Sequence, residues 1–382
     1  MTAPDAVPAA KFENADFVAS LADDDLVYFL LNVGDADCQL ILLPAGAPGS
    51  ARDAIVVDVG LSGKLPDLIG DLKRPDGSDL VGEIRVVVAS HPHLDHIRGM
   101  GEFLRRFKGR VDEYWDSGYR QPSSVYFNVM RELEDQQDTL TYVQPTSGMT
   151  RYFGRLRLTV LAPSVSLRNQ YDSYGIDPNN SSVCIKLEYP VTRAVEENDK
   201  RFLENRNTEQ RTTTRIILGA DAQMVSWGRV LEDFPDLQPD NSTVWRALGM
   251  KNGWTPLRAE ILKVPHHCSK NGVTVELAAM VKAQLALISS KGTASSYGFP
   301  HALAQGALRE AKEAIAQSGL PTWTKADHEL GIHYTGADDD AGTTLGTIAL
   351  VVKAASQSAA MWRFGDSPSS SVDLTKARRF RK

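Results

Sequence analysis

The chain has 382 residues, of which 42% are hydrophobic and 24% charged, and this is the composition of a globular protein with a full core. Its formal net charge of −6 does not point to a nucleic-acid partner, because affinity for phosphate backbones rests on Lys and Arg, although an acidic body is compatible with a basic groove. Three well-separated cysteines make no disulfide framework and favour a reducing compartment. With neither a signal peptide nor an apolar stretch of about 20 residues, the sequence predicts a cytoplasmic protein without a membrane partner.

The first residues, 1–24, are rich in Ala, Pro and Asp and are predicted to form a flexible arm. One domain is predicted over 25–366, with a charged insertion at 191–213 inside a hairpin and a basic tail at 367–382. Apolar and β-branched runs predict strands at 26–32, 39–43, 54–60, 84–90, 155–163, 182–189, 215–219, 261–264, 285–289, 347–352 and 360–364. Helical periodicity predicts helices at 65–72, 100–107, 121–136, 275–283 and 302–319.

The order of these elements favours an α/β fold. The first three strands are separated by Pro- and Gly-containing turns and suggest a meander. Helices then intersperse with further strands, and strands return at the end of the chain. This pattern predicts two sheets with helices on the outside.

Ligand-type residues cluster at two places in the sequence. His91, His93, Asp95 and His96 follow the buried strand 84–90 directly, in a loop at the kind of strand end where α/β proteins build sites. A second group, His266 and His267, follows the strand 261–264. Imidazoles beside a carboxylate suit Zn²⁺, Mn²⁺ or Fe, and no thiolate is required. The alternative is a polar loop that contains these histidines by chance. Burying the polar side chains would then cost desolvation free energy with no compensating interaction.

Several motifs together resemble the metallo-β-lactamase superfamily, and within it the soluble hydrolase domain of the bacterial ComEC-type competence proteins. HPHLDHIRGM resembles the H-x-H-x-D-H signature, and LKVPHHCS resembles "LKvpHHGS". NVGDADCQLIL, IVVDVG, LGADAQ and SSYGFPH match further motifs of that branch in the same order, from about residue 26 to residue 301. The resemblance implies an αββα sandwich, in which two mixed sheets pack face to face with helices outside. The transmembrane channel of the competence proteins is absent, so DNA uptake is not implied.

The resemblance also implies a role for each matching residue. Two divalent metal ions, Zn or Mn, would be held by His91, His93, Asp95, His96, Asp221 and His267. Asp221 would bridge both ions, His91 and His93 would bind the first, and the other three would bind the second. Asp95, His266 and His301 would be catalytic, with Asp95 orienting water and His266 contacting the substrate phosphate or donating a proton. Residues near the metals or the substrate would be Asp58, Asn180, Ser269 and Lys291.

Three positions depart from the family pattern, and three further roles stay open. The usual third His on the first metal is missing, and Asn180 is the obvious substitute in that region. Cys268 replaces a Gly in HHCS, and Phe299 replaces the first His of the last motif, which leaves His301 as its only imidazole. His301 is equally compatible with a structural role, Lys291 with a plain linker, and Asp58 with a strand-end cap.

The sequence therefore predicts a metal-dependent hydrolase, in which a hydroxide activated by two metals attacks the substrate. The ComEC-like motifs favour a phosphodiesterase or nuclease, whose partner is a nucleic acid or nucleotide. One alternative is a hydrolase of a small ester, lactone or phosphoester, because the same metal pair serves all these reactions. Another is a non-catalytic binding or regulatory module.

Overall fold

A computed structural model gives the fold of the chain and describes residues 6–171, 176–191, 194–197, 200–203, 213–233, 257–316, 325–354, 356 and 358–381. Most of the predicted insertion 191–213 lies outside the described residues, apart from a short hairpin of β11 (Ala194–Glu197) and β12 (Lys200–Leu203). In the described part of the chain, no helix has both the length and the apolar character needed to span a membrane.

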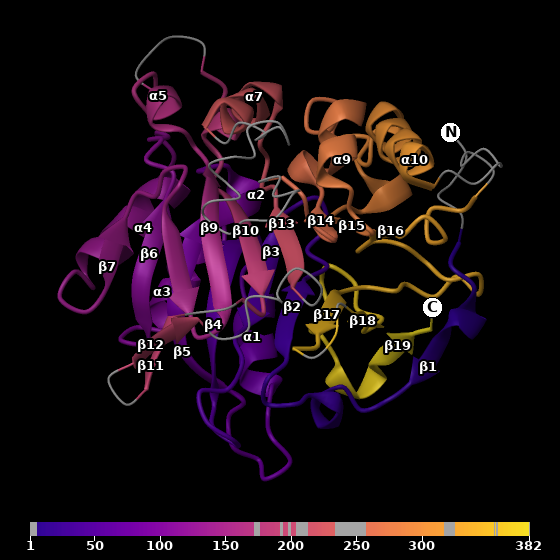
Figure 1. The fold of residues 1–382 in the computed structure, drawn as a ribbon, viewed down its shortest axis with the longest axis horizontal. Coiled ribbons are helices and arrows are strands. Elements are labelled where there is room, and N and C mark those ends of the chain that lie inside the picture. The colour runs from indigo at the N-terminus through magenta and orange to yellow at the C-terminus, as the bar shows by residue number, and fades with distance from the viewer. Residues whose placement is uncertain are drawn as a thin grey trace.

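Two large sheets form the body of the protein (Figure 1). The first has the strand order β1-β19-β18-β17-β2-β3-β4-β5-β6-β7 and the second β16-β15-β14-β13-β10-β9-β8. The strands of the first sheet are β1 (Phe12–Asn14), β2 (Leu26–Leu30), β3 (Cys38–Leu42), β4 (Arg52–Val59), β5 (Val81–Ala89), β6 (Val111–Asp116), β7 (Thr141–Val143), β17 (Ile348–Val352), β18 (Ala359–Arg363) and β19 (Arg378–Phe380). Those of the second are β8 (Thr150–Phe153), β9 (Leu156–Ala162), β10 (Cys184–Tyr189), β13 (Thr214–Leu218), β14 (Ile261–Lys263), β15 (Leu285–Ile288) and β16 (Ile332–Tyr334).

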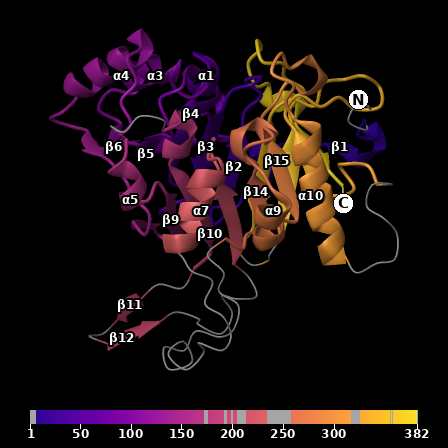
Figure 2. The same cartoon turned by 90° about the horizontal axis from the view of Figure 1, so that it is seen from above.

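Helices cover the two outer faces (Figure 2). On the side of the first sheet lie α1 (Lys64–Asp71), α3 (Met100–Arg106) and α4 (Ser124–Glu134). On the side of the second lie α7 (Met224–Asp233), α9 (Val275–Val281) and α10 (Ala302–Ala316). Two short helices, α2 (Leu94–Ile97) and α5 (Val165–Arg168), occupy loops. The four layers are the predicted αββα sandwich, and the predicted meander is confirmed because β2, β3 and β4 pair antiparallel in sequence order.

Strand β2 shows why the sandwich needs continuous apolar runs. Both faces of its sheet are covered, so all five of its residues are buried. Tyr28 faces the core between the sheets, together with Ile185 of β10 and Ile216 of β13. Phe29 points the other way, into the core that α1 and α3 cover. A strand buried on both faces has no polar side, which is why it appears in the sequence as a solid apolar run.

The described residues near both ends of the chain, from 6 on and up to 381, pack against the domain. The described part of the predicted flexible arm contains β1, which pairs antiparallel with β19 of the predicted basic tail. Phe17 of the arm is fully buried, and its ring meets those of Phe29, Trp362 and Phe364 at centroid distances of 5.3 to 5.4 Å. One aromatic anchor among small and charged residues fixes this segment, and composition alone does not reveal it.

The anchor gives a stability prediction. We expect Phe17→Ala to lower the free energy of unfolding by about 3–5 kcal/mol, because it leaves a cavity among three rings. Phe127→Ala, which removes a ring that is 66% exposed, is the matched control and should change that free energy by less than about 0.5 kcal/mol. Urea unfolding followed by circular dichroism measures both, and equal effects of the two variants would contradict the anchoring role.

Candidate metal centre

The first ligand loop begins where the buried strand β5 ends. His91 lies two residues past Ala89 and is buried, and His96 is buried on the short helix α2. His93 precedes α2 with an extended backbone, and the backbone N–H of His96 donates to its carbonyl at 3.0 Å. The change from extended chain to helix within six residues turns His91 and His96 toward each other, with ring centroids 4.1 Å apart.

The second sheet brings the other two ligands to the same place. Strands β13 and β14 run parallel and adjacent, so Asp221 and His267, which follow their carboxyl ends, emerge at one edge. The backbone of His266, His267 and Cys268 is left-handed, with φ between 49° and 63°, and the N–H of His266 donates to the carbonyl of Ala220 at 2.8 Å. This strained turn directs the imidazole of His267 back into the site, and such strain is typical of functional positions.

The carboxylate of Asp221 is the centre of the cluster. Its Oδ2 lies 3.3 Å from Nε2 of His96 and 3.9 Å from Nε2 of His91, while its Oδ1 lies 3.7 Å from Nε2 of His267. Asp95 Oδ2 completes the group, at 3.8 Å from His96 Nε2 and 3.6 Å from His267 Nε2. Asp95, His96, Asp221 and His267 thus offer four ligand atoms within 4.8 Å of one another, which fits a metal ion.

Unpaired polar atoms support the same conclusion. His91 Nε2, His96 Nε2, His267 Nε2 and Asp221 Oδ1 are all buried and make no hydrogen bond within the described structure. Buried polar atoms in folded proteins are almost always paired, so four unpaired ones at a single place need a partner. All four are atoms that bind divalent metals. The donor set therefore fits a cation.

Hydrogen bonds behind the ligands fix which ring nitrogen faces the centre. His267 Nδ1 donates to the carbonyl of Ser289 at 2.9 Å, and His96 Nδ1 donates to Asp58 Oδ2 at 2.7 Å. Since each Nδ1 is engaged in this way, Nε2 is the nitrogen that faces the site, where it can bind a metal ion or a second proton. Asp58 is fully buried with φ of 61°, and it also accepts from the N–H and hydroxyl of Ser90, both at 2.7 Å. It thereby orients the loop that carries the histidines.

For His96 and Asp221, burial and neighbouring charges shift the pKa in opposite directions. Although burial favours neutral imidazole, the carboxylates of Asp221 and Asp58 raise the pKa of His96 well above its usual value. Burial likewise opposes the charge on Asp221, yet His96 and His267 hold the pKa of Asp221 well below its usual value. His91 differs, because burial and the charge of His96 lower its pKa, so its imidazole is neutral and competent to bind metal.

A buried ion pair lies beneath the ligands. Lys263, the last residue of β14, donates through Nζ to Asp37 Oδ2, and both side chains are fully buried. Nζ also donates to the carbonyl of Ala220 at 3.2 Å, next to Asp221, while Asp37 Oδ1 lies 3.8 Å from Nδ1 of His267. Both residues belong to motifs of the sequence, NVGDADCQLIL and LKVPHHCS, but the motifs alone predict no role for them. One sequence feature could have indicated the pair: Lys263 is a charged residue inside an apolar strand.

Three predicted residues lie at the border of the cluster. The ring of His93 contacts that of His91, with centroids 4.7 Å apart, and is half-buried. His266 Nε2 lies 3.8 Å from Asp221 Oδ2, and its side chain is 16% exposed, so it faces both the cluster and solvent. Asn180 is buried close by, but its Oδ1 accepts from the N–H of Ser226 at 3.1 Å in the first turn of α7. Its metal-binding oxygen is thus already engaged.

The other predicted substrate contacts have local partners. His301 Nδ1 accepts from the N–H of Leu303 at 3.2 Å and so caps α10, and the N–H of His301 donates to the carbonyl of Cys268. Ser269 Oγ accepts from the N–H of Asn271 at 3.4 Å. Lys291 has an exposed side chain that lies over Gly34. The described contacts of these residues do not include the ligand cluster.

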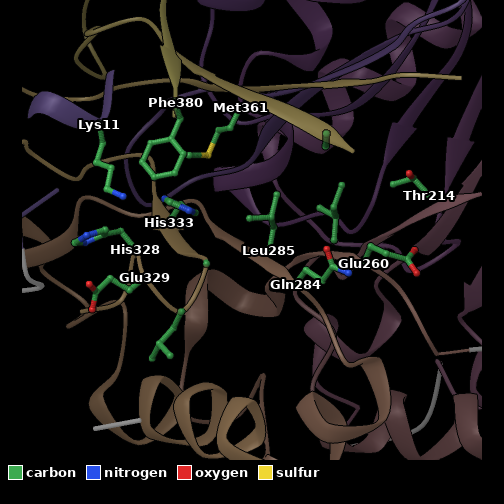
Figure 3. A pocket seen from close by; sticks show the side chains of 14 residues that line it. Lys11, Thr214, Glu260, Gln284, Leu285, His328, Glu329, His333, Met361 and Phe380 are labelled. Atoms are coloured by element: carbon green, nitrogen blue, oxygen red, sulfur yellow. The ribbon is translucent and has the colours of Figure 1, made fainter. Parts of the chain in front are cut away.

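A large cavity lies away from the ligand cluster. It has a volume of about 500 Å³ and opens between the sheets, with His328 and His333 facing Phe380 and Met361 (Figure 3). None of the predicted ligands lines it. Burial lowers the pKa of His333 to about 3, so this imidazole is a neutral part of the wall, as expected for a histidine outside the motifs.

Comparison with known families agrees with this geometry. A family model described as the metallo-β-lactamase superfamily matches residues 49–135, which contain Asp58 and the ligand loop 91–96. The fold is a metallo-β-lactamase sandwich. The match and the clustered ligands support a metal-binding hydrolase of the metallo-β-lactamase fold. No curated protein matches the chain, and the finer resemblance to ComEC-type proteins stays a prediction.

Solved structures of the metallo-β-lactamase fold are similar at low identity. YhfI from Bacillus subtilis, a metallo-β-lactamase fold protein, is 10% identical with a TM-score of 0.38, and the alignment covers 82% of this chain and 98% of that one. A long form RNase Z from yeast is 12% identical with a TM-score of 0.36, and the alignment covers 73% of this chain and 38% of that one. A diphosphatase from the PhnP family is 11% identical with a TM-score of 0.32, covering 82% and 95%. We transfer no activity at these values.

The ion pair beneath the site gives a prediction. We expect Lys263→Met to lower the free energy of unfolding by about 3–5 kcal/mol, because it leaves Asp37 charged and unpaired in the core. Lys73→Met breaks an exposed pair with Asp79 and is the matched control, with an expected loss below about 1 kcal/mol. Urea denaturation measures both. The double variant Lys263→Met with Asp37→Leu should recover much of the lost free energy of unfolding. If its loss equals the sum of the losses of the two single variants, the pairing is contradicted.

Proposed function

We propose that this chain is a metal-dependent phosphodiesterase or nuclease. The observation that carries the proposal is the set of four buried, unpaired ligand atoms around Asp221, at one edge of the two sheets. Asp95, His96 and His267 would hold one divalent ion with Asp221. His91 and His93 would hold a second on the other side of the same carboxylate.

The two ion positions are unequal in this chain. The first position has four protein atoms within 4.8 Å of one another. His91 and His93 have only Asp221 to complete their set, because Oδ1 of Asn180 already accepts a hydrogen bond. More protein ligands hold an ion more tightly. We therefore infer one tight and one weak position, and the weak one leaves more room for substrate oxygens.

The protein residues around the ions have distinct tasks. When bound, divalent ions supply a nucleophile at neutral pH and offset charge on the transition-state oxygens. Asp95 has a side chain that is 37% exposed, so its carboxylate reaches both the ligands and the water that enters the site. His266 borders the cluster with its Nε2 and would contact the substrate phosphate or donate a proton to the leaving oxygen. Asp58 keeps His96 in one tautomer throughout.

The loops that carry or flank the ligands also carry basic side chains. Arg98, Lys270 and Lys291 have exposed side chains on the three loops that carry or flank the ligands. Cations at these positions attract an anionic substrate toward a cluster that is otherwise rich in carboxylates. The rest of the surface is acidic overall, which disfavours tight duplex binding.

The direct test is hydrolysis of a reporter diester. Purified protein supplied with Mn²⁺ or Zn²⁺ should release p-nitrophenolate from bis-p-nitrophenyl phosphate, and chelation should stop the release. Cleavage of a lactone or thioester in place of this reporter would favour a small-ester hydrolase. A metal content near zero in protein purified without chelator would contradict metal-dependent catalysis and favour a binding module.

The neighbouring histidines give a sharper prediction. His267→Ala and Asp221→Ala should lose metal and turnover together, because each removes unpaired ligand atoms. His266→Ala should keep its metal while turnover falls by about 10²- to 10⁴-fold, the usual contribution of a general acid. His328→Ala, far from the cluster in the wall of the large cavity, is the matched control and should change neither. Inductively coupled plasma mass spectrometry gives the metal content. Loss of metal from His266→Ala would contradict the roles proposed for the two histidines and make His266 a metal ligand.

A further inference from the structure

A column of three stacked rings leads from the metal centre to the surface. The ring of Phe299 stacks on the imidazole of His267, with centroids 5.6 Å apart and an interplanar angle of 27°. Tyr297 in turn stacks on Phe299, at 5.7 Å and 23°. Since both angles are small, each ring is close to parallel with its neighbour. The column starts at a predicted metal ligand and ends in solvent.

Tyr297 is the outer ring of this column and is unusually exposed. Its exposed fraction is 73%, the largest among the large hydrophobic side chains of the described residues. One face packs on Phe299, so most of this exposure belongs to the other face and the edges. A single exposed apolar side chain is ordinary in itself. Its place at the end of a stack that begins on a ligand is what distinguishes Tyr297.

The loop that carries the column is held in place. Ser295 Oγ accepts from the N–H groups of Tyr297 at 3.2 Å and of Phe299 at 3.0 Å. Ser290 Oγ donates to the carbonyl of Phe299 at 2.9 Å. The last of these bonds ties the loop to Ser290, which is two residues past the end of β15 and adjacent to Ser289, whose carbonyl fixes His267. Because the loop is already ordered, stacking of a flat partner on this ring costs little conformational entropy.

We propose that the free face of Tyr297 is a stacking platform for an unpaired base of single-stranded nucleic acid, whose backbone then enters the metal centre. The inference rests on the proposed function and narrows its substrate class. A flat aromatic base is the partner that extends a column of parallel rings, and stacking contributes about 1–3 kcal/mol per base without regard to sequence. Bases inside a duplex are already stacked, so they are not available to this surface.

Charge favours the same substrate. The net charge of −6 gives little general attraction to a phosphate backbone, so affinity must come from another source. Stacking on Tyr297 supplies it without added cations, while exposed Lys270 and Lys291 lie on loops that flank the column and can meet phosphates locally. A duplex has no free bases, so it could use the lysines but would gain nothing from the stacking surface.

The test compares two oligomers of equal length and charge. One is a fluorescently labelled ten-residue oligothymidylate, and the other carries abasic residues in place of its bases. Fluorescence anisotropy on the chelated full-length protein gives the dissociation constants without cleavage. We expect Tyr297→Ala to raise the dissociation constant of the oligothymidylate by about 5- to 150-fold, the equivalent of one stacked base, and to leave that of the abasic oligomer unchanged. Tyr297→Phe should stay within about twofold of wild type, because it keeps the ring.

A second exposed tyrosine provides the control. Tyr152 is 56% exposed on the edge strand β8, and Tyr152→Ala should not change either dissociation constant. If Tyr297→Ala weakens both oligomers equally, or neither, or if Tyr297→Phe weakens binding as much as Tyr297→Ala does, the platform is refuted.

Turnover separates this inference from the proposed function. Metal-loaded wild type should cleave the oligothymidylate with a lower KM than the abasic oligomer, and Tyr297→Ala should remove that difference. Cleavage of both oligomers with equal KM would overturn the platform while supporting the phosphodiesterase. Binding that depends on Tyr297 without metal-dependent cleavage of either oligomer would overturn the phosphodiesterase while supporting the platform.

Discussion

The buried pair of Lys263 and Asp37 connects the two halves of the metal centre. Asp37 lies at the start of β3 in the first sheet, and Lys263 ends β14 in the second. Each half contributes some of the ligands, so their distances depend on how the sheets are fixed relative to each other. Apolar packing between sheets is not directional. An ion pair with full burial has one favourable geometry, and here it also reaches the carbonyl of Ala220 beside Asp221.

The cluster is built so that a cation completes it. Asp58 and Asp221 lie on opposite sides of the His96 ring, and their charges raise the pKa of His96 although burial lowers it. A proton is thus one way to balance the buried carboxylates, and a divalent ion is another that also satisfies the unpaired Nε2 atoms. Close packing preserves this arrangement, because a Cβ on Gly60 would lie 2.0 Å from the carbonyl oxygen of Asp95.

The sequence was most informative where a pattern is local. Continuous apolar runs located β2 and β5, and the ligand spacing after β5 located the loop 91–96. Strand β6 (Val111–Asp116) escaped prediction, since Asp112 and Glu113 interrupt its apolar pattern and its pairing with β5 compensates for them. The Lys263–Asp37 contact spans 226 positions, and the hydrogen bond that engages Asn180 comes from α7. Contacts of this kind depend on the assembled fold, and spacing does not encode them.

Phe299 shows how a departure from a motif acquires meaning in three dimensions. In the sequence it was a lost imidazole, because the resembling motif has a histidine there. In the structure its ring packs on His267 and lies 5.8 Å from His266, so it covers the apolar side of the imidazole whose Nδ1 is held by Ser289. A neutral ring in place of an imidazole removes one proton donor from the site and adds a surface for stacking. The same exchange that weakens the case for acid catalysis by this motif therefore strengthens the case for a substrate with aromatic bases.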